Sequence, residues 1–107
     1  MNGLTFTEYQ YKAASTAVYP PKNAVPYLSL GLAAEAGEVA DKVAKYYRGD
    51  KDLDPVALIQ ELGDVLWFVS QLSGVLGFTL EQAATLNMNK LHTRKLNNTL
   101  KGDGDNR

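Results

Sequence analysis

The sequence predicts an all-α fold, and three observations carry that prediction. Apolar residues recur at three-, four- and seven-residue steps through four segments, and capping, proline or glycine residues bound each segment. No segment alternates apolar and polar residues with β-branched enrichment over about five positions, which is the pattern of a strand. The chain has 107 residues, a length that fits one domain.

The first two helices are expected over residues 5–18 and 25–47. Tyr19-Pro20-Pro21 should end the first, because proline cannot continue a helix and restricts the residue before it. The second is long, and Arg48-Gly49-Asp50 supplies its end signal.

The third helix is expected over residues 55–77, with Asp54 as its cap, Pro55 at its first position and Gly77 closing it. It is apolar on nearly every side, so it should lie centrally or at a subunit interface. Thr79 and Gln82 form a capping-box pattern that opens a fourth helix to about residue 95. Residues 1–100 should therefore form one domain, and residues 101–107, rich in turn residues, should form a flexible C-terminal tail.

Composition excludes several classes of function. The net charge is -1 with no basic cluster, so a nucleic-acid-coating protein is not expected. There is no cysteine for disulfides or thiolate metal sites. No apolar run approaches the roughly 20 residues of a membrane span, and the N-terminus lacks the pattern of an export signal. We expect a soluble cytoplasmic protein with no membrane partner.

Four carboxylates stand out by their spacing. Glu61 and Asp64 are three residues apart within the apolar third helix, and Glu35 and Glu38 are three apart within a small, apolar stretch of the second. Each pair therefore lies on one helix face. Burying unpaired carboxylates is costly unless cations compensate. If the two helices pack antiparallel, all four converge.

The two acidic segments also repeat each other. EAGEVADKV (35–43) and ELGDVLWFV (61–69) share Glu, any residue, Gly, an acid and Val, then three residues and a second Val. Gly37 and Gly63 match, although a glycine inside a helix costs about 1 kcal/mol relative to alanine. This pairing indicates close backbone approach or room left for a ligand.

Carboxylates without His or Cys companions suit a hard divalent cation, Mg²⁺ above all, with Mn²⁺ as a substitute. Mg²⁺ commonly shares its shell with phosphates, so the ligands point to a phosphate substrate. The alternative is an ordinary solvated acidic face. In that case Lys42, four residues after Glu38, and Lys45, four after Asp41, would be intrahelical partners.

These motifs resemble the MazG-like nucleoside triphosphate pyrophosphohydrolases of the all-α pyrophosphatase superfamily. The signature ExxE, spacer, ExxD stands here as Glu35-Ala-Gly-Glu38, residues 39–60, and Glu61-Leu-Gly-Asp64. Family members often carry Asn, Lys and Arg on the last helix, matched here by Asn87, Lys90 and Arg94, and the GDGDNR ending is similar to that of small stand-alone members. Many members have a further Glu where this chain has Ala34, and we assign that position no role.

The resemblance implies a four-helix MazG-like bundle and Mg²⁺-dependent hydrolysis of (d)NTP between the α and β phosphates, giving a nucleoside monophosphate and pyrophosphate, in nucleotide-pool house-cleaning. Its catalytic and metal residues would be Glu35, Glu38, Glu61 and Asp64, one of which also orients water. Substrate-binding residues would be Asn87, Lys90, Arg94 and Phe68, the last by stacking on a base.

Alternatives stay open for these residues and for the function. Lys90 and Arg94 also fit an ordinary basic last turn, and Phe68 and Trp67 also fit a core. The substrate class includes dUTP, dCTP and phosphoribosyl-ATP as alternatives, and a non-enzymatic helical dimerisation module is the alternative outside the enzyme class. Because 107 residues leave little wall around a nucleotide, we expect a homodimer or tetramer with the site near a subunit boundary.

Overall fold

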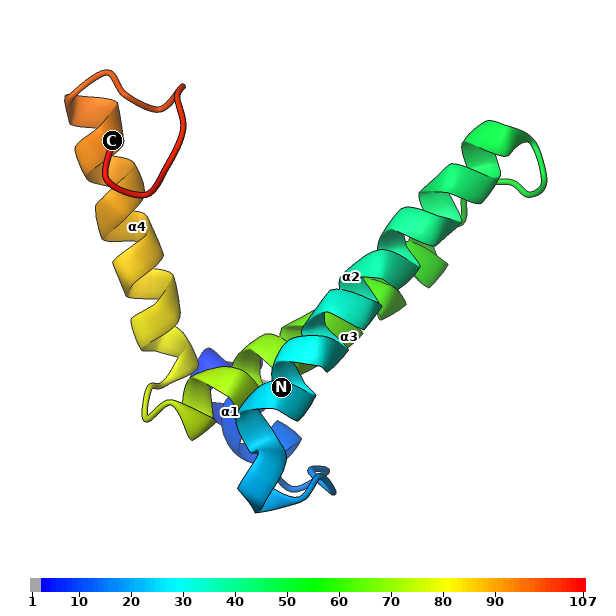
Figure 1. Ribbon diagram of the computed structural model, residues 1–107, viewed down its shortest axis with the longest axis horizontal. Coiled ribbons are helices and arrows are strands. Elements are labelled where there is room, and N and C mark those ends of the chain that lie inside the picture. The colour runs from blue at the N-terminus through cyan, green and yellow to red at the C-terminus, as the bar shows by residue number, and fades with distance from the viewer. Residues whose placement is uncertain (1–2) are drawn as a thin grey trace.

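The computed structural model describes residues 3–107 and is helical throughout (Figure 1). Its elements are α1 (Phe6–Ala14), the 3₁₀ helix η1 (Pro21–Asn23), α2 (Ala24–Arg48), α3 (Pro55–Val75) and α4 (Leu80–Leu96). No strand occurs within this described range. The all-α prediction is confirmed, with four main helices.

Three of the helix starts carry side-chain caps. The Asp54 side chain accepts a hydrogen bond from the Val56 N–H at 3.0 Å, with Pro55 at the first position of α3. Thr79 and Gln82 form the reciprocal capping box at the start of α4. The Thr5 side chain caps α1 by accepting a hydrogen bond from the Glu8 N–H. The predicted starts of α3 and α4 are therefore confirmed.

α1 is shorter than the sequence pattern predicts. It ends at Ala14 and not near Val18. The Ser15 and Thr16 hydroxyls donate to the carbonyls of Lys12 and Ala13 at 2.6 and 2.7 Å. Such local side-chain bonds compete with helix continuation, so the chain turns before the prolines are reached. The 3₁₀ turn η1 then leads into α2 and was not anticipated.

The helices form a V (Figure 1). α2 and α3 run side by side in opposite directions as one arm, and α4 leaves α3 at a bend of 99° as the other. α1 packs against α3 and α4 near the bend, where the Gln10 amide donates to the Ser70 and Phe78 carbonyls and accepts from the Leu80 N–H. α3 touches all three other helices, so its predicted central position is confirmed.

The hydrophobic core of the single chain is thin. Among the described residues, the buried apolar side chains are Ala13, Ala24, Leu28 and Leu80, and of these only Leu28 is completely buried. The radius of gyration is 16.6 Å, whereas a compact chain of this length has about 13 Å. Many large apolar side chains of α2, α3 and α4 are consequently exposed.

A close contact between α2 and α3 lies at Gly31 of α2. A β-carbon there would come within 2.1 to 2.8 Å of three ring atoms of Phe68 on α3. Glycine therefore lets the Phe68 ring lie directly on the backbone of α2. At Gly37 and Gly63 a β-carbon would meet nothing within 4 Å. Of the two expectations for these glycines, close backbone approach is therefore wrong, and room left for a ligand stays a prediction.

No single helix of residues 3–107 is long and apolar enough to cross a membrane. α3 and α4 meet such a test only when taken together, as a sharply bent pair.

Candidate metal centre

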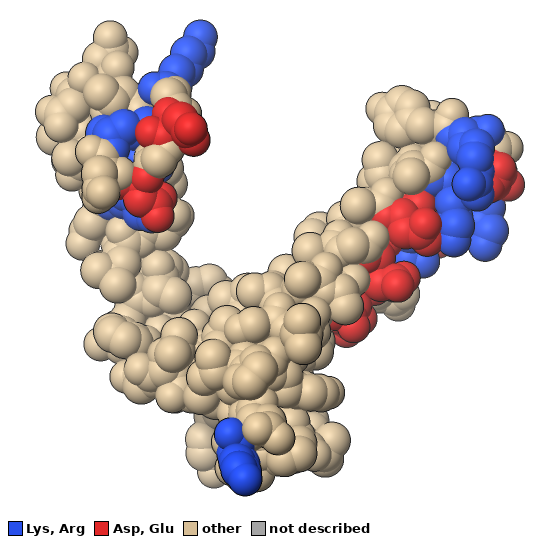
Figure 2. All heavy atoms as spheres, viewed as in Figure 1, with Lys and Arg blue, Asp and Glu red and all other residues tan. Residues whose placement is uncertain are grey.

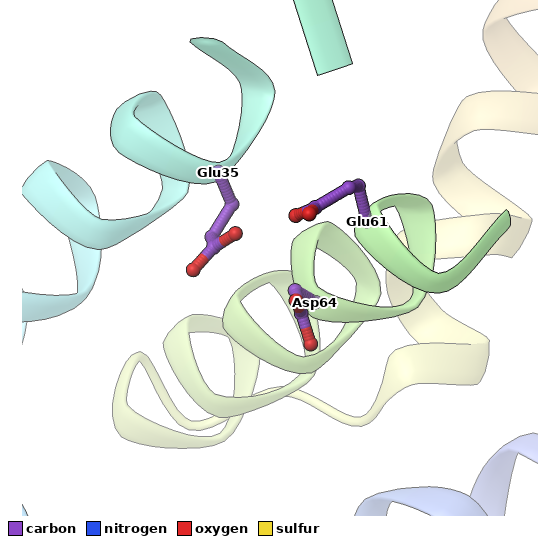
Figure 3. A group of neighbouring side chains, drawn as sticks. All are labelled: Glu35, Glu61 and Asp64. Atoms are coloured by element: carbon purple, nitrogen blue, oxygen red, sulfur yellow. The ribbon is translucent and has the colours of Figure 1, made fainter. Parts of the chain in front are cut away.

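Three of the four predicted carboxylates converge between α2 and α3. One oxygen from each of Glu35, Glu61 and Asp64 lies within 4.8 Å of the others. Figure 3 shows the Glu35 side chain pointing from α2 toward Glu61, with Asp64 one turn along α3. The antiparallel pairing of the two helices brings these three residues together, whereas the spacing of the two acid pairs predicts that all four would converge. Three carboxylate oxygens at this separation are a donor set that suits a hard divalent cation.

Glu38 does not belong to this group. It is exposed and lines a hollow of about 310 Å³ between the end of α2, the loop at residues 51–54 and the start of α3. Ligand pockets usually measure about 300–1,000 Å³, so the hollow is at the small end of that range. The single chain thus joins one carboxylate of the first motif with both of the second.

Two lysines lie beside the acids. The sequence allowed both of them to pair with an acid of their own helix, and only one of them does. Lys45 pairs with Asp41 at 2.7 Å, as its spacing predicts. Lys42 reaches across to α3, where its Nζ lies 3.8 Å from Glu61 Oε1, and no ion pair joins it to Glu38. Because this contact crosses between helices, sequence spacing along one helix did not indicate it.

The carboxylates repel one another in the absence of a cation. Burial, followed by the negative charges of Asp64 and Glu61, raises the pKa of Glu35 above its ordinary value. Burial and the charge of Asp64 also raise the pKa of Tyr9, which reaches this region from α1. A divalent cation would offset the negative charges that contribute to both shifts, so the residues present fit a metal ion.

The aromatic residues beside the motif pack mainly on each other. The Phe68 ring centroid lies 4.9 Å from that of Trp67 and 6.4 Å from that of Tyr27. The indole N–H of Trp67 donates to the Thr16 hydroxyl, and the Tyr19 hydroxyl donates to Gln71. This placement gives Phe68 a packing role between α2 and α3, and its role in base binding stays a prediction.

The predicted substrate-binding residues of α4 lie far from the carboxylates. α4 makes no contact with α2 within the described chain, and Figure 2 shows uncharged surface between the acidic side chains of one arm and the charged end of the other. Asn87 is exposed, Lys90 is partly exposed, and Arg94 is only 7% exposed. Within one chain, α4 cannot complete the carboxylate site.

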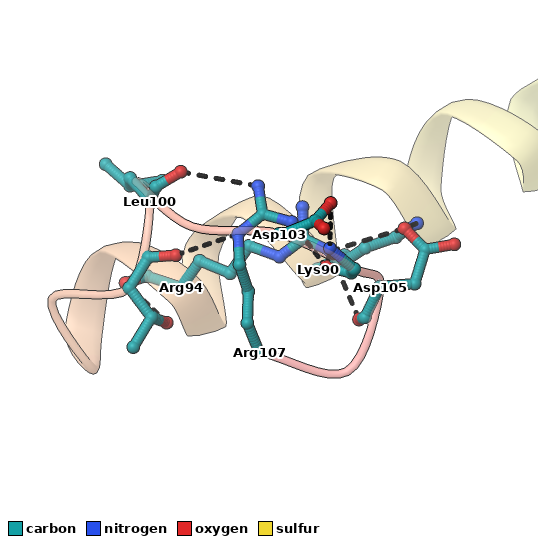
Figure 4. Close-up of polar contacts among 8 residues, drawn as sticks. Lys90, Arg94, Leu100, Asp103, Asp105 and Arg107 are labelled. Carbon is teal, nitrogen blue, oxygen red and sulfur yellow. Dashed lines mark hydrogen bonds and ion pairs between the residues drawn. The ribbon is translucent and has the colours of Figure 1, made fainter.

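The C-terminal tail covers this end of α4 (Figure 4). Asp105 Oδ1 lies 3.2 Å from Lys90 Nζ and 3.4 Å from Arg94 Nη2, and these two cations hold the pKa of Asp105 below its ordinary value. The predicted flexibility of residues 101–107 stays a prediction, but the tail is folded back and bonded. Sequence reasoning missed Asp105, whose only signal was its place in the turn-rich GDGDNR ending.

Comparison with known proteins agrees with the family resemblance that the motifs indicate. Residues 25–98 match the model of the MazG nucleotide pyrophosphohydrolase domain. The chain is also similar to the Gene 37 protein of Mycobacterium phage L5, with 41% identity over 110 residues covering 92% of this chain and 96% of that protein. No solved structure matches.

The family match covers α2, α3 and α4, including both acidic motifs. It supports a nucleotide pyrophosphohydrolase-like function in general, in a family that generally depends on divalent metals. This chain belongs to the MazG nucleotide pyrophosphohydrolase family.

Proposed function

We propose that this chain hydrolyses nucleoside triphosphates between the α and β phosphates in a Mg²⁺-dependent reaction. The observation that carries the proposal is the convergence of Glu35, Glu61 and Asp64, with their oxygens within 4.8 Å, on the two motifs of the family match. Such a reaction needs positioning and charge neutralisation and no nucleophilic side chain. This suits a chain without cysteine.

Glu35, Glu61 and Asp64 would hold the metal, with Mn²⁺ as a substitute for Mg²⁺. The bound ion would polarise phosphate oxygens and lower the pKa of a coordinated water. The neighbouring Glu38 carboxylate is available to complete the ion's shell or to accept a proton from the attacking water. Lys42, drawn toward Glu61 here, would be free to pair with phosphate once a metal neutralises that carboxylate.

A second copy of the chain should complete the site. The accessible surface is 8135 Å², whereas a compact monomer of this mass has about 5,900 Å². The excess of about 2,200 Å² is the amount that each partner contributes to a large obligate interface. The exposed apolar side chains of both arms would then be covered, in a dimer or a tetramer. Lys90 would reach the phosphates at the partner's carboxylates.

The reaction is tested by measuring pyrophosphate release from a panel of ribo- and deoxynucleoside triphosphates, dUTP, dCTP and phosphoribosyl-ATP, with and without Mg²⁺. Glu61→Gln should lower kcat/KM about a hundredfold or more, equivalent to about 2.7 kcal/mol of transition-state stabilisation. Glu8→Gln, the same change at an exposed residue of α1, should leave the rate unchanged. No release from any compound would support the non-enzymatic helical module instead.

The shared site is tested by mixing two inactive variants. If Glu61 and Lys90 act from different chains, randomly mixed dimers of Glu61→Gln and Lys90→Gln contain some intact sites and recover about a quarter of the activity. If both residues serve one chain's site, mixing recovers nothing.

Light scattering measures the mass of the assembly and so tests whether a second chain covers the exposed apolar side chains. Ile59 on α3 is 66% exposed in the single chain and Val18 is 94% exposed in the loop after α1. Ile59→Asp should dissociate or unfold the protein, because it places a charge in the proposed interface. Val18→Asp should change neither mass nor stability.

A further inference from the structure

The end of α4 and the residues after it form a built polar unit, which we call the clasp: Lys90, Arg94 and residues 97–107. Its backbone turns at Asn98, Gly102 and Gly104, whose φ angles of 56°, 134° and 82° lie in the left-handed region. These turns fold the segment back against α4 (Figure 4). The Asp103 side chain accepts the Gly104 N–H at 2.9 Å and so supports the turn from outside.

Arg94 lies at the centre of the clasp, 7% exposed. Its Nη2 donates to the carbonyls of Gly104 and Asp105 at 3.4 and 3.1 Å, and to Asp105 Oδ1 at 3.4 Å. Its Nε is buried and has no hydrogen-bond partner. An unsatisfied buried donor on a charged group is costly, so this nitrogen points to an acceptor that the chain itself does not supply.

Arg107 closes the clasp on its other side. Its guanidinium donates to the carbonyls of Thr99, Leu100 and Gly104. Its side chain also crosses Gly102 closely, since a β-carbon there would lie 2.9 Å from Arg107 Cδ. The tail is thus held to α4 mainly by arginine-to-backbone bonds, which do not depend on the Asp105 side chain.

The side chains of the clasp carry more positive than negative charge. Its cations are Lys90, Arg94, Lys101 and Arg107, and its side-chain carboxylates are Asp103 and Asp105. Among the described residues, Asp105 alone supplies a carboxylate that pairs with Lys90 and Arg94. The Asp105 side chain is 82% exposed, so it can rotate into water without disturbing the buried part of the clasp.

We propose that the clasp is a phosphate-binding site in which the Asp105 carboxylate is the resident anion, displaced from Lys90 and Arg94 when a polyphosphate binds. The inference rests on the proposed function, because it makes the phosphates of the substrate the displacing group. A phosphate offers more acceptor oxygens than a carboxylate, so it can satisfy Lys90 Nζ and the unpartnered Arg94 Nε together. Asp105 thereby sets how tightly the phosphates bind.

The opposite reading assigns Asp105 a positioning role, in which its charge holds Lys90 ready for the phosphates. The two interpretations predict opposite changes in phosphate affinity when the Asp105 charge is removed. Removing a competing anion tightens phosphate binding, whereas removing a positioning group weakens it.

The test is calorimetric titration with inorganic tripolyphosphate in EDTA. Asp105→Asn should tighten binding about threefold to fivefold, the effect of removing one weak exposed ion pair. Asp103→Asn is the matched control, because it removes the same charge from the same tail without touching Lys90. It should change the affinity less than about twofold. Lys90→Gln should weaken tripolyphosphate binding both in the natural protein and in Asp105→Asn.

Weaker binding in Asp105→Asn, or a change no larger than in Asp103→Asn, would overturn the proposal, as would the absence of tripolyphosphate binding in all variants. Hydrogen exchange of residues 99–107 verifies that the tail of Asp105→Asn stays folded. Because the titration uses neither metal nor turnover, its result is separate from that of the pyrophosphate assay. Hydrolysis that needs Glu61 but ignores Asp105 would refute only the clasp.

Discussion

Substituting Gly31 by alanine tests the packing that holds the two motif helices together. The new methyl carbon would lie 2.1 Å from Phe68 Cε1 and 2.4 Å from Cζ, well inside contact distance. The ring cannot retreat freely, because Trp67 and Tyr27 pack against it. Overpacking of this kind costs about 1–3 kcal/mol, and the gain in helix propensity returns about 1 kcal/mol. We therefore expect Gly31→Ala to destabilise the protein by about 1 kcal/mol.

Gly37→Ala is the matched control in the same helix. A β-carbon at Gly37 meets nothing within 4 Å, so this variant should gain about 1 kcal/mol. Urea unfolding followed by the fluorescence of Trp67, the single tryptophan, measures both at one protein concentration. Their difference isolates the steric cost because helix propensity cancels. Equal stabilities would refute the packing of Phe68 on Gly31 and would favour a Phe68 ring free to stack on a base.

Three further predictions concern the metal centre and the helix caps. Mg²⁺ at a hundredfold excess over its Kd should stabilise the protein by about 2.7 kcal/mol, and thermal unfolding should show little of this gain in Glu61→Gln. Because the folded state raises the pKa of Glu35, the contribution of this residue to stability in EDTA should be fully present below the ordinary glutamate pKa and be lost as pH rises through the raised value. Asp41, Glu81 and Asp105 have lowered pKa values and contribute in the opposite direction, so unfolding is measured at several pH values for both proteins, and the natural protein should lose stability relative to Glu35→Gln as pH rises. Thr79→Ala should cost about 1 kcal/mol by removing the α4 capping box, whereas Thr85→Ala, at an exposed mid-helix position, should cost nothing by the same assay.

Residue patterns were sufficient to predict the structural features whose causes are local in the sequence. The Asp54-Pro55 start, the Thr79 capping box and the central apolar α3 depend on residues a few positions apart, and all were predicted. The end of α1 was not predicted, because the hydroxyls of Ser15 and Thr16 bond backwards before Pro20 is reached.

The candidate site also has features that residue spacing predicted and features that it could not predict. Spacing placed Glu35 against Glu61 and Asp64 once the helices paired. Spacing could not show that Lys42 points across to α3, because that depends on the rotation of one helix against the other. It also could not show the burial of Arg94, which depends on a tail that returns to its helix through left-handed turns at Gly102 and Gly104.

The open shape and the charge arrangement have a common explanation in the proposed assembly. On one arm, burial and the neighbouring carboxylates raise the pKa of Glu35, and on the other arm Lys90 and Arg94 pair with Asp105. The acidic arm lacks a cation and the basic arm lacks a phosphate. The thin core of the single chain does little to offset the cost of placing like charges together. If a second copy brings the basic arm to the acidic one, burial of the apolar faces and neutralisation by metal and phosphate occur at the same boundary. Folding, metal binding and substrate binding would then be linked, because each supplies what the others lack.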